Sequence, residues 1–337
     1  MIKRFFKSIY SKQILLFFVF LFVFIGNALC EEKTFSPLYP LRKDAPKLTT
    51  EGFLPEDSDE NYYLLIDKEA GEWTYIDKKL FINIRSFNDV VERKRTLVWY
   101  ETEVKVAPGE KFNIEHANPE QIGRRFLYAE DFATKLNTIL ALSDDFYGFR
   151  VYQKRLPGVI IQNGEILADK SKKQPHWSLP TYDLIARYPD GTMKAYLAGS
   201  INAEELHAQG VTDTWCFGPV LLSEGEIGAQ VLEKRFEYAN PRQTIGMIKP
   251  NHYLIMTIEG RNSRSHGVGL VWVAERMRDL GCTEALNLDG GNSVKLVFMG
   301  KLINSDRTYD KKNDRSVTSL ITLGYFPLET LEESKTE

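Results

Sequence analysis

Residues that could carry catalysis lie beside paired glycines in the C-terminal third of the chain. The segment Asn287-Leu288-Asp289-Gly290-Gly291-Asn292-Ser293 places a carboxylate at the end of a predicted buried strand. Glycine lets the backbone adopt a positive φ and lets a ligand approach it closely. Successive N–H groups in such a turn can form a concave site for an anion. A plain hairpin turn is the alternative, because Asp-Gly is a strong hairpin signal.

A second segment combines an acid with arginines between a predicted strand and a predicted helix. It contains Glu259, Arg261, Arg264 and Ser265. The planar guanidinium groups could hold a phosphate through paired hydrogen bonds. Backbone N–H groups at the start of the helix would favour an anion as well. A solvated polar loop, with Ser265 as the helix cap, is the alternative interpretation.

Two further segments carry candidate residues. Asp144-Asp145 follows an apolar strand, and paired carboxylates can divide acid and base roles when their environments differ. Adjacent residues on a strand point in opposite directions, so we expect Asp145 to face a site and Asp144 to lie in an acidic turn. Arg242 and Thr244 come just before another predicted strand. They could contact a phosphate, although a structural turn explains them equally well.

These segments need strands that end close together, and the sequence contains many strand patterns. Strands or strand–turn–strand patterns are predicted over 95–106, 138–142, 156–166, 221–227, 252–259 and 294–303. Apolar residues have helical spacing over 119–137 and over 268–280, where Gly281 suits a helix C-cap. This balance predicts an α+β fold: a mixed or mostly antiparallel sheet core with a few flanking helices.

The first thirty residues have the pattern of an export signal. Basic residues at positions 3, 4, 7 and 12 precede an apolar run over 14–25, which is shorter than the roughly 20 residues that span a membrane. We interpret residues 1–30 as a secretory signal peptide or, alternatively, as an N-terminal membrane anchor. The protein is then expected to be secreted, periplasmic or on the cell surface, and to contact a membrane only through this segment if it is uncleaved.

The remaining chain is predicted to have four parts. Residues 31–58 are rich in Pro and charge and form a linker, 59–96 form an extension packed on the main domain, 97–326 form the main domain, and 327–337 form a polar tail. Loss of residues 1–30 removes four basic and no acidic residues, leaving 39 basic and 46 acidic side chains and a net charge of −7. This charge gives no electrostatic basis for binding nucleic acid.

The cysteines leave two interpretations open. Cys216 and Cys282 remain after the signal is removed, and they could pair outside the cytoplasm or be two buried free thiols. The three cysteines of the chain lack the spacing of a zinc site. No cofactor is therefore expected, and the question of a divalent cation stays open.

The order and spacing of the segments resemble the phosphodiester glycosidase family from about Leu97 to Phe326. That family includes the lysosomal uncovering enzyme, and its bacterial exported branch, associated with exopolysaccharide biosynthesis, is more similar to this chain. The resembling segments are Ala141–Gly148, Gly158–Gly164, Phe217–Leu221, Pro241–Gly246, Ile258–Arg261, Ser265–Leu270, Ala285–Ser293 and Arg315–Val317.

The resemblance implies an exported hydrolase that releases a sugar from a phosphodiester-linked glycan of the cell envelope or exopolysaccharide. Such enzymes generally need two carboxyl groups. The catalytic carboxylates would be Asp289, Glu259 and Asp145. The substrate or phosphate contacts would come from Arg261, Arg242, Thr244, Ser265, Gly290, Gly291, Asn292, Ser293 and Arg315.

Some residues depart from the family pattern, and they motivate alternatives. Ser143-Asp144 replaces the Asn-Gly of the family pattern. Glu259 replaces its Asp, Gly269 its Thr, Asn292 its third Gly and Val294 its second Ser. A catalytically silent glycan-binding or assembly protein in exopolysaccharide export is therefore the alternative function. A metal-dependent phosphodiesterase that uses Asp289, Glu259 and Asp145 is a third. The sugar, its aglycone, the stereochemical course and the oligomeric state do not follow from the sequence.

Overall fold

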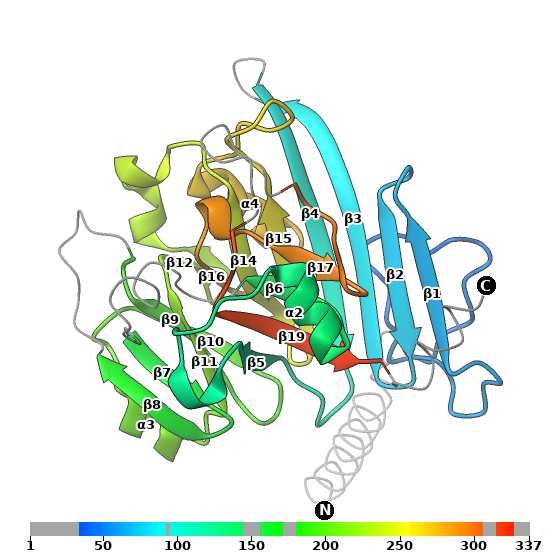
Figure 1. Cartoon of the computed structure of the whole chain (residues 1–337), viewed down its shortest axis with the longest axis horizontal. Coiled ribbons are helices and arrows are strands. Elements are labelled where there is room, and N and C mark those ends of the chain that lie inside the picture. Colours follow the sequence, from blue (N-terminus) through cyan, green and yellow to red (C-terminus); the bar gives the residue numbers. More distant parts are fainter. Residues whose placement is uncertain are drawn as a thin grey trace, which may run out of the picture. The chain divides into compact units, whose positions relative to one another are not determined.

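The computed structural model describes residues 34–91, 95–143, 156, 158–170, 180–305 and 315–326. The chain separates into two units, Met1–Ser36 and Pro37–Glu337, and the fold described here is that of the second. Among the described residues, every recorded strand pairing is antiparallel. The predicted α+β class with a mostly antiparallel sheet core is confirmed (Figure 1).

The largest sheet of the described chain has nine strands in the order β1-β2-β3-β4-β15-β14-β16-β12-β13. Its strands are β1 (Tyr62–Asp67), β2 (Glu72–Asp77), β3 (Leu80–Val91), β4 (Arg95–Val106), β12 (Val220–Ser223), β13 (Glu226–Ile227), β14 (Arg242–Lys249), β15 (His252–Ile258) and β16 (Glu284–Asn287). A five-stranded sheet, in the order β18-β17-β6-β19-β5, contains β5 (Asn113–His116), β6 (Thr138–Ser143), β17 (Leu296–Phe298), β18 (Lys301–Leu302) and β19 (Ser319–Tyr325).

Two smaller sheets and the helices complete the described fold. The small sheets are β7 (Gly158–Gln162) with β8 (Glu165–Lys170), and β9 (Asp183–Arg187) between β10 (Met193–Tyr196) and β11 (Asp213–Phe217). The α-helices are α2 (Ala129–Leu136), α3 (Ala203–Ala208) and α4 (Leu270–Asp279). The 3-10 turns are η2 (Pro119–Gln121), η4 (Ala229–Leu232), η5 (Lys234–Phe236) and η6 (Gly291–Ser293).

The core forms layers because the side chains of each strand alternate between its two faces. Tyr100 on β4 and Ile255 on β15 point into the core between the nine-stranded and five-stranded sheets. Trp99, next to Tyr100 on β4, and Ile258, which pairs with Trp99 from β15, point to the opposite face and pack against α4. Helix α2 covers the outer face of the five-stranded sheet through a separate cluster that includes Phe132. The layer order is therefore helix, sheet, sheet, helix.

Two sequence predictions are corrected by the structure. The predicted helix over 119–137 is interrupted: η2 and α2 are separated by Gly123, whose φ is 76°, and by Leu127, which forms a bridge with Val317. The hairpin alternative for the Asp289 turn is wrong, because β16 lies in the nine-stranded sheet and β17 lies in the five-stranded sheet. The turn therefore crosses from one layer to the other.

Other predictions agree with the structure. The strands over 95–106 and 138–142, the hairpin around Asn163-Gly164 and the helix that ends before Gly281 are all present. Cys216 and Cys282 are buried and are not joined to each other, so the disulfide alternative is wrong. No helix in the described part of the chain is long and apolar enough to cross a membrane.

Residues that the sequence predicts to be linker contact the nine-stranded sheet. The Leu38 amide donates to Glu103 at 2.8 Å, and the Tyr39 hydroxyl donates to Glu101. The Glu101 carboxylate also accepts from Arg276 Nε of α4 at 2.7 Å. Glu101 and Glu103 are almost fully buried. The segment around Leu38 and Tyr39 thus supplies donors to two carboxylates that would otherwise be buried with fewer partners.

Arg276→Met should destabilise the fold. Removing the cation leaves the buried Glu101 carboxylate with weaker compensation, so we expect the free energy of unfolding to fall by about 2–3 kcal/mol. Arg278→Met is the matched control, because Arg278 lies on the same helix and is exposed. Urea unfolding measures both variants. Equal stability of the two would contradict this role for Arg276.

Candidate active site

Strand β14 brings three of the predicted segments to one end of the nine-stranded sheet. It runs antiparallel to β15 on one side and to β16 on the other. Arg242 at its start pairs with Ile258 near the end of β15, and Thr244 pairs with Asn287 at the end of β16. The loop after β15 and the turn after β16 therefore lie on either side of the start of β14.

Each neighbouring strand is followed there by an acid–glycine step beside Pro241. The first side-chain carbon of any residue other than glycine would lie 2.8 Å from Pro241 N at Gly260 and 2.7 Å from Pro241 O at Gly290. Both glycines are therefore required by close backbone packing. Because neighbouring strands lie about 4.8 Å apart, the backbones of Glu259 and Asp289 are separated by about two strand spacings, or about 10 Å.

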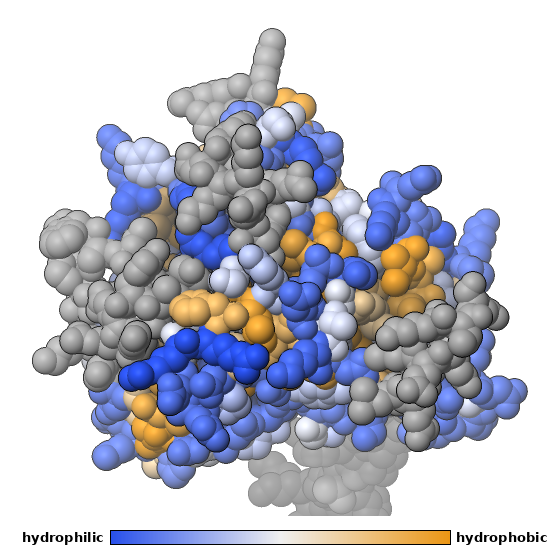
Figure 2. All heavy atoms as spheres, viewed as in Figure 1, coloured by the Kyte–Doolittle hydropathy of each residue, from blue (hydrophilic) through white to orange (hydrophobic). Residues whose placement is uncertain are grey.

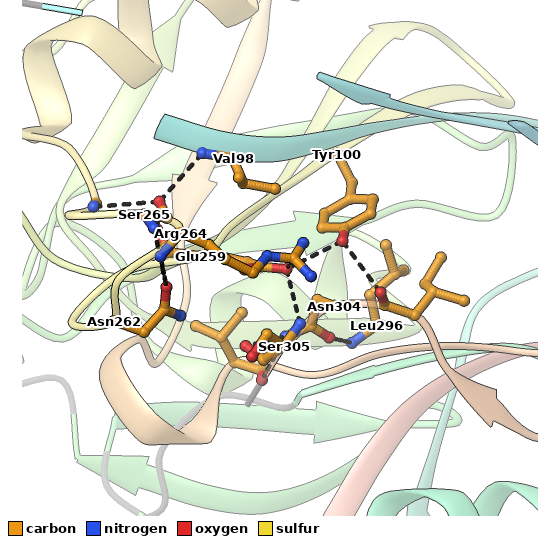
Figure 3. A network of polar contacts seen from close by, with 12 residues as sticks. Val98, Tyr100, Glu259, Asn262, Arg264, Ser265, Leu296, Asn304 and Ser305 are labelled. Atoms are coloured by element: carbon orange, nitrogen blue, oxygen red, sulfur yellow. Dashed lines mark hydrogen bonds and ion pairs between the residues drawn. The ribbon is translucent and has the colours of Figure 1, made fainter. Parts of the chain in front are cut away.

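Glu259 is held in a polar network between the sheets (Figure 3). Its Oε1 accepts from the Tyr100 hydroxyl at 3.0 Å, from Arg264 Nη2 at 3.2 Å and from the Ser305 amide at 2.7 Å. The side chain is 0% exposed. Its Oε2 is also buried and has no hydrogen-bond partner among the residues that the structure describes. The carboxyl is thus fixed through one oxygen.

The environment of Glu259 favours the protonated carboxyl. Burial raises its pKa, and the Ser305 amide, the Arg264 charge and the Tyr100 hydroxyl oppose that rise only in part. Burial and the neighbouring Glu259 charge also raise the pKa of Tyr100, which keeps its phenol neutral as a donor. A carboxyl whose pKa is raised in this way holds a proton to higher pH than an exposed carboxyl does.

Two neighbouring arginines have no acidic partner among the described residues. Arg242 donates to two backbone carbonyl oxygens, Val268 O from Nε at 3.2 Å and Tyr238 O from Nη2 at 3.0 Å. Arg261 donates twice to Asn240 Oδ1, from Nε at 3.2 Å and Nη2 at 2.7 Å. Within the described chain neither forms an ion pair, and neither Nη1 has a hydrogen-bond acceptor.

The closeness of these two cations has an electrostatic cost. Burial, together with the Arg261 charge, lowers the pKa of Arg242 to about 10. Like charges repel, so an anion placed between them would remove this repulsion and use the remaining donors. The charge and remaining donors of the pair suit a phosphate or another oxyanion as a ligand.

The turn after Asp289 lies beside the same cations. Asp289 is half-buried. At Gly291, where φ is 62°, the first carbon of a side chain would lie 3.1 Å from Arg261 Nη1. On the other side of the turn, Arg315 Nη1 donates to Ser293 Oγ at 3.1 Å. Arg315 thus lies at the turn, as the resemblance implies, and Asn292 occupies its middle.

Two predicted phosphate contacts use their hydroxyls within the fold. Ser265 Oγ donates to Glu259 O at 2.7 Å and accepts from Val98 N at 3.1 Å, so it fixes the loop that follows β15. Thr244 Oγ1 is buried in the sheet and accepts from Met256 N at 3.1 Å. Both side chains are fully buried, so neither hydroxyl is accessible to a ligand.

The sequence alone does not identify Tyr100 and Ser305 as members of the site, and it assigns Arg264 a different partner. Tyr100 carries no local signal, because its contact depends on the pairing of β4 with β15. Ser305 acts through its backbone amide, which any residue except proline would supply. The sequence predicts that Arg264, like Arg261, could hold a phosphate, whereas the structure pairs Arg264 with Glu259. Asp145 lies outside the described residues.

No metal centre is apparent in the described ranges. They contain no group of three or more His, Cys, Asp or Glu side chains that could hold a metal ion.

The fold and the site together define an α+β protein in which carboxylates, and arginines without an acidic partner in the described chain, meet at one end of an antiparallel sheet. Residues 137–323 match the family model for phosphodiester glycosidases, and the chain belongs to that family. Glycosidase-type chemistry is the function of this family by its description.

Solved structures share this fold. The catalytic domain of zebrafish N-acetylglucosamine-1-phosphodiester alpha-N-acetylglucosaminidase, auto-inhibited by its pro-peptide, matches with a TM-score of 0.59 and 17% identity, over 73% of this chain and 84% of that one. A Burkholderia pseudomallei K96243 protein, described as a candidate exported protein, matches with a TM-score of 0.50 and 13% identity, over 70% and 75%.

A curated relative is also similar over part of its length. It is the SPbeta prophage-derived uncharacterized protein YomE of Bacillus subtilis (strain 168), which is 29% identical over 140 residues. The match covers 41% of this chain and 21% of the Bacillus protein. This chain thus spans about a fifth of that relative.

Glu259 should give the fold a measurable pH dependence. Its pKa is raised on folding from the usual 4.5, so its favourable contribution is complete below that pH and is lost as pH rises through the folded value. Glu259→Gln should remove this loss, so the variant gains stability relative to the native protein as the pH rises above about 4.5.

Urea unfolding at a series of pH values measures this difference. Glu204→Gln, which changes an exposed residue of α3, is the control and should give a flat difference. A Glu259→Gln difference that stays flat or falls with pH would contradict the assignment of a raised pKa to this carboxyl.

Arg261→Met should weaken phosphate binding without unfolding the protein, because Arg261 is exposed. Loss of a charge-assisted contact predicts a roughly 10- to 100-fold rise in the dissociation constant for inorganic phosphate. Calorimetric titration measures it, with Arg278→Met as the exposed control. Unchanged affinity in Arg261→Met would show that the anion binds elsewhere.

Proposed function

We propose that this chain is an exported hydrolase that cleaves a sugar from a phosphodiester-linked glycan of the cell envelope or exopolysaccharide. The observation that carries the proposal is the placement of Glu259 and Asp289 on either side of Pro241-Arg242, beside two arginines without acidic partners in the described chain. Carboxyl groups and phosphate-binding cations are the groups that this reaction needs.

The arginines bind the phosphate and stabilise it as it leaves. Water attacks the anomeric carbon, the bond from that carbon to the phosphate oxygen breaks, and the electron pair stays on the phosphate monoester. Arg242 and Arg261 stabilise this developing charge through their remaining donors, and Arg315 supports the turn on the other side. A phosphate monoester is a good leaving group and needs little help from a general acid. Removal of a proton from the attacking water is therefore the more demanding proton transfer.

The two carboxyl groups have different roles in proton transfer because their environments differ. Asp289, which is half-buried, is placed to accept the proton of the attacking water as a general base. Glu259, whose pKa is raised by burial, holds a proton and orients the reacting centre through its network with Tyr100 and Ser305. Asp145 stays a candidate third carboxylate.

Export is part of the proposal. The signal-like segment over 1–30 supports it, and so does the fold shared with a protein described as a candidate exported protein. Residues 31–337 would then act outside the cytoplasm.

Asp289→Asn and Glu259→Gln should each lower the rate of sugar release by roughly 100- to 10,000-fold. The assay incubates residues 31–337 with glucose-, galactose- and N-acetylglucosamine-1-phosphodiesters that carry methyl or hexopyranosyl aglycones, and measures free sugar. Glu284→Gln is the matched control, since Glu284 is a buried carboxylate at the other end of β16 that accepts from the Ala195 and Glu224 amides.

The outcomes separate this proposal from its rival. Retained activity in either site variant would contradict its assigned role. Binding of these diesters without sugar release by the native protein would favour the silent glycan-binding or assembly function, which the departures at Asn292 and Val294 motivate.

A further inference from the structure

An exposed aromatic residue is attached directly to the arginine pair. Tyr238 is 63% exposed and lies in the loop between η5 and β14. Its carbonyl oxygen accepts from Arg242 Nη2 at 3.0 Å and from Asn240 Nδ2 at 3.3 Å. Asn240 in turn accepts from Arg261 through its Oδ1. The backbone of Tyr238 is therefore held by the residues that position both guanidinium groups.

The ring of Tyr238 has no aromatic or cation–π partner among the described residues, and its hydroxyl has no hydrogen bond to them. A fixed backbone that carries an exposed ring is pre-organised for contact with a ligand, because little conformational freedom is lost on binding. Leu232, also 63% exposed in the same connection, has no such link to the arginines. Figure 2 shows hydrophobic and strongly hydrophilic surfaces side by side on one face of the molecule.

The carbonyl of Tyr238 and the carboxyl of Glu259 lie toward different faces of the nine-stranded sheet. Arg242 pairs with Ile258, and directly opposed residues on antiparallel strands point to the same face. Ile258 packs toward α4, and Arg242 reaches Val268 near the start of that helix. Glu259, the next residue, contacts Tyr100 between the sheets. A phosphate on the arginines would thus have the carboxyl on one side and Tyr238 on the other.

This arrangement separates the two ends of a phosphodiester. The sugar that is cleaved must lie beside the carboxyl groups, so the group that stays on the phosphate extends toward Tyr238. We propose that Tyr238 is a specificity-determining residue whose ring stacks on the flat apolar face of a ring-bearing aglycone. This inference rests on the proposed function, and it predicts a preference for cyclic over linear aglycones.

The test compares two substrates that differ only in the aglycone: an N-acetylglucosamine-1-phosphodiester with a hexopyranosyl group and its methyl counterpart. Tyr238→Ala should lower kcat/KM for the hexopyranosyl substrate roughly tenfold, mostly through KM, and leave the methyl substrate unchanged. Tyr238→Phe should keep the native preference, since the ring and not the hydroxyl makes the contact. Leu232→Ala is the control for loss of an equally exposed apolar side chain.

The outcomes distinguish this inference from the function on which it rests. Native protein that cleaves both substrates, together with a Tyr238→Ala variant that affects both equally or neither, overturns the aglycone role alone. Native protein that cleaves neither substrate overturns the proposed function and this inference together. Loss of the hexopyranosyl preference in Tyr238→Phe would show that hydrogen bonding, not stacking, selects the aglycone, and would overturn the proposal.

Discussion

The pairing of β14 with strands that run antiparallel to it on both sides is the constraint on which the site depends. The start of one strand is set between the ends of two others, so residues far apart in sequence meet beside Pro241. Gly260 and Gly290 permit this approach, because no side chain fits at either position. A shift of one residue in either register would turn Glu259 or Arg242 to the other face of the sheet.

The second constraint is the crossing between layers. After β16 the chain leaves the nine-stranded sheet, forms η6 and enters β17 of the five-stranded sheet. The loop after β18 then brings the Ser305 amide to Glu259, and Tyr100 approaches from β4. Burial would make an isolated carboxylate costly, and these donors offset part of that cost. The arginines have only neutral acceptors and no acidic partner in the described chain, which leaves them suited to an anionic ligand.

Local sequence patterns predict the helices and strands better than they predict the contacts between side chains. Alternation identified β4, helical spacing identified α4, and Asn163-Gly164 identified a hairpin, because each depends on residues close in sequence. The partners of Glu259 could not be read this way, since Tyr100 is 159 residues away and meets it only through sheet register. Ser265 and Thr244 have residue types that suit phosphate binding, but their hydroxyls form hydrogen bonds with the backbone instead. Hydrogen-bonding capacity alone does not tell which partner a hydroxyl will find.

The central claim is that the acids and arginines around Pro241 direct water to a sugar carbon and not to phosphorus. Hydrolysis of an N-acetylglucosamine-1-phosphodiester in water labelled with oxygen-18 tests this directly, with mass spectrometry of both products. Cleavage at the sugar predicts the label in the anomeric hydroxyl and an unlabelled phosphate monoester. Label in the phosphate product would contradict the account and identify a phosphodiesterase instead.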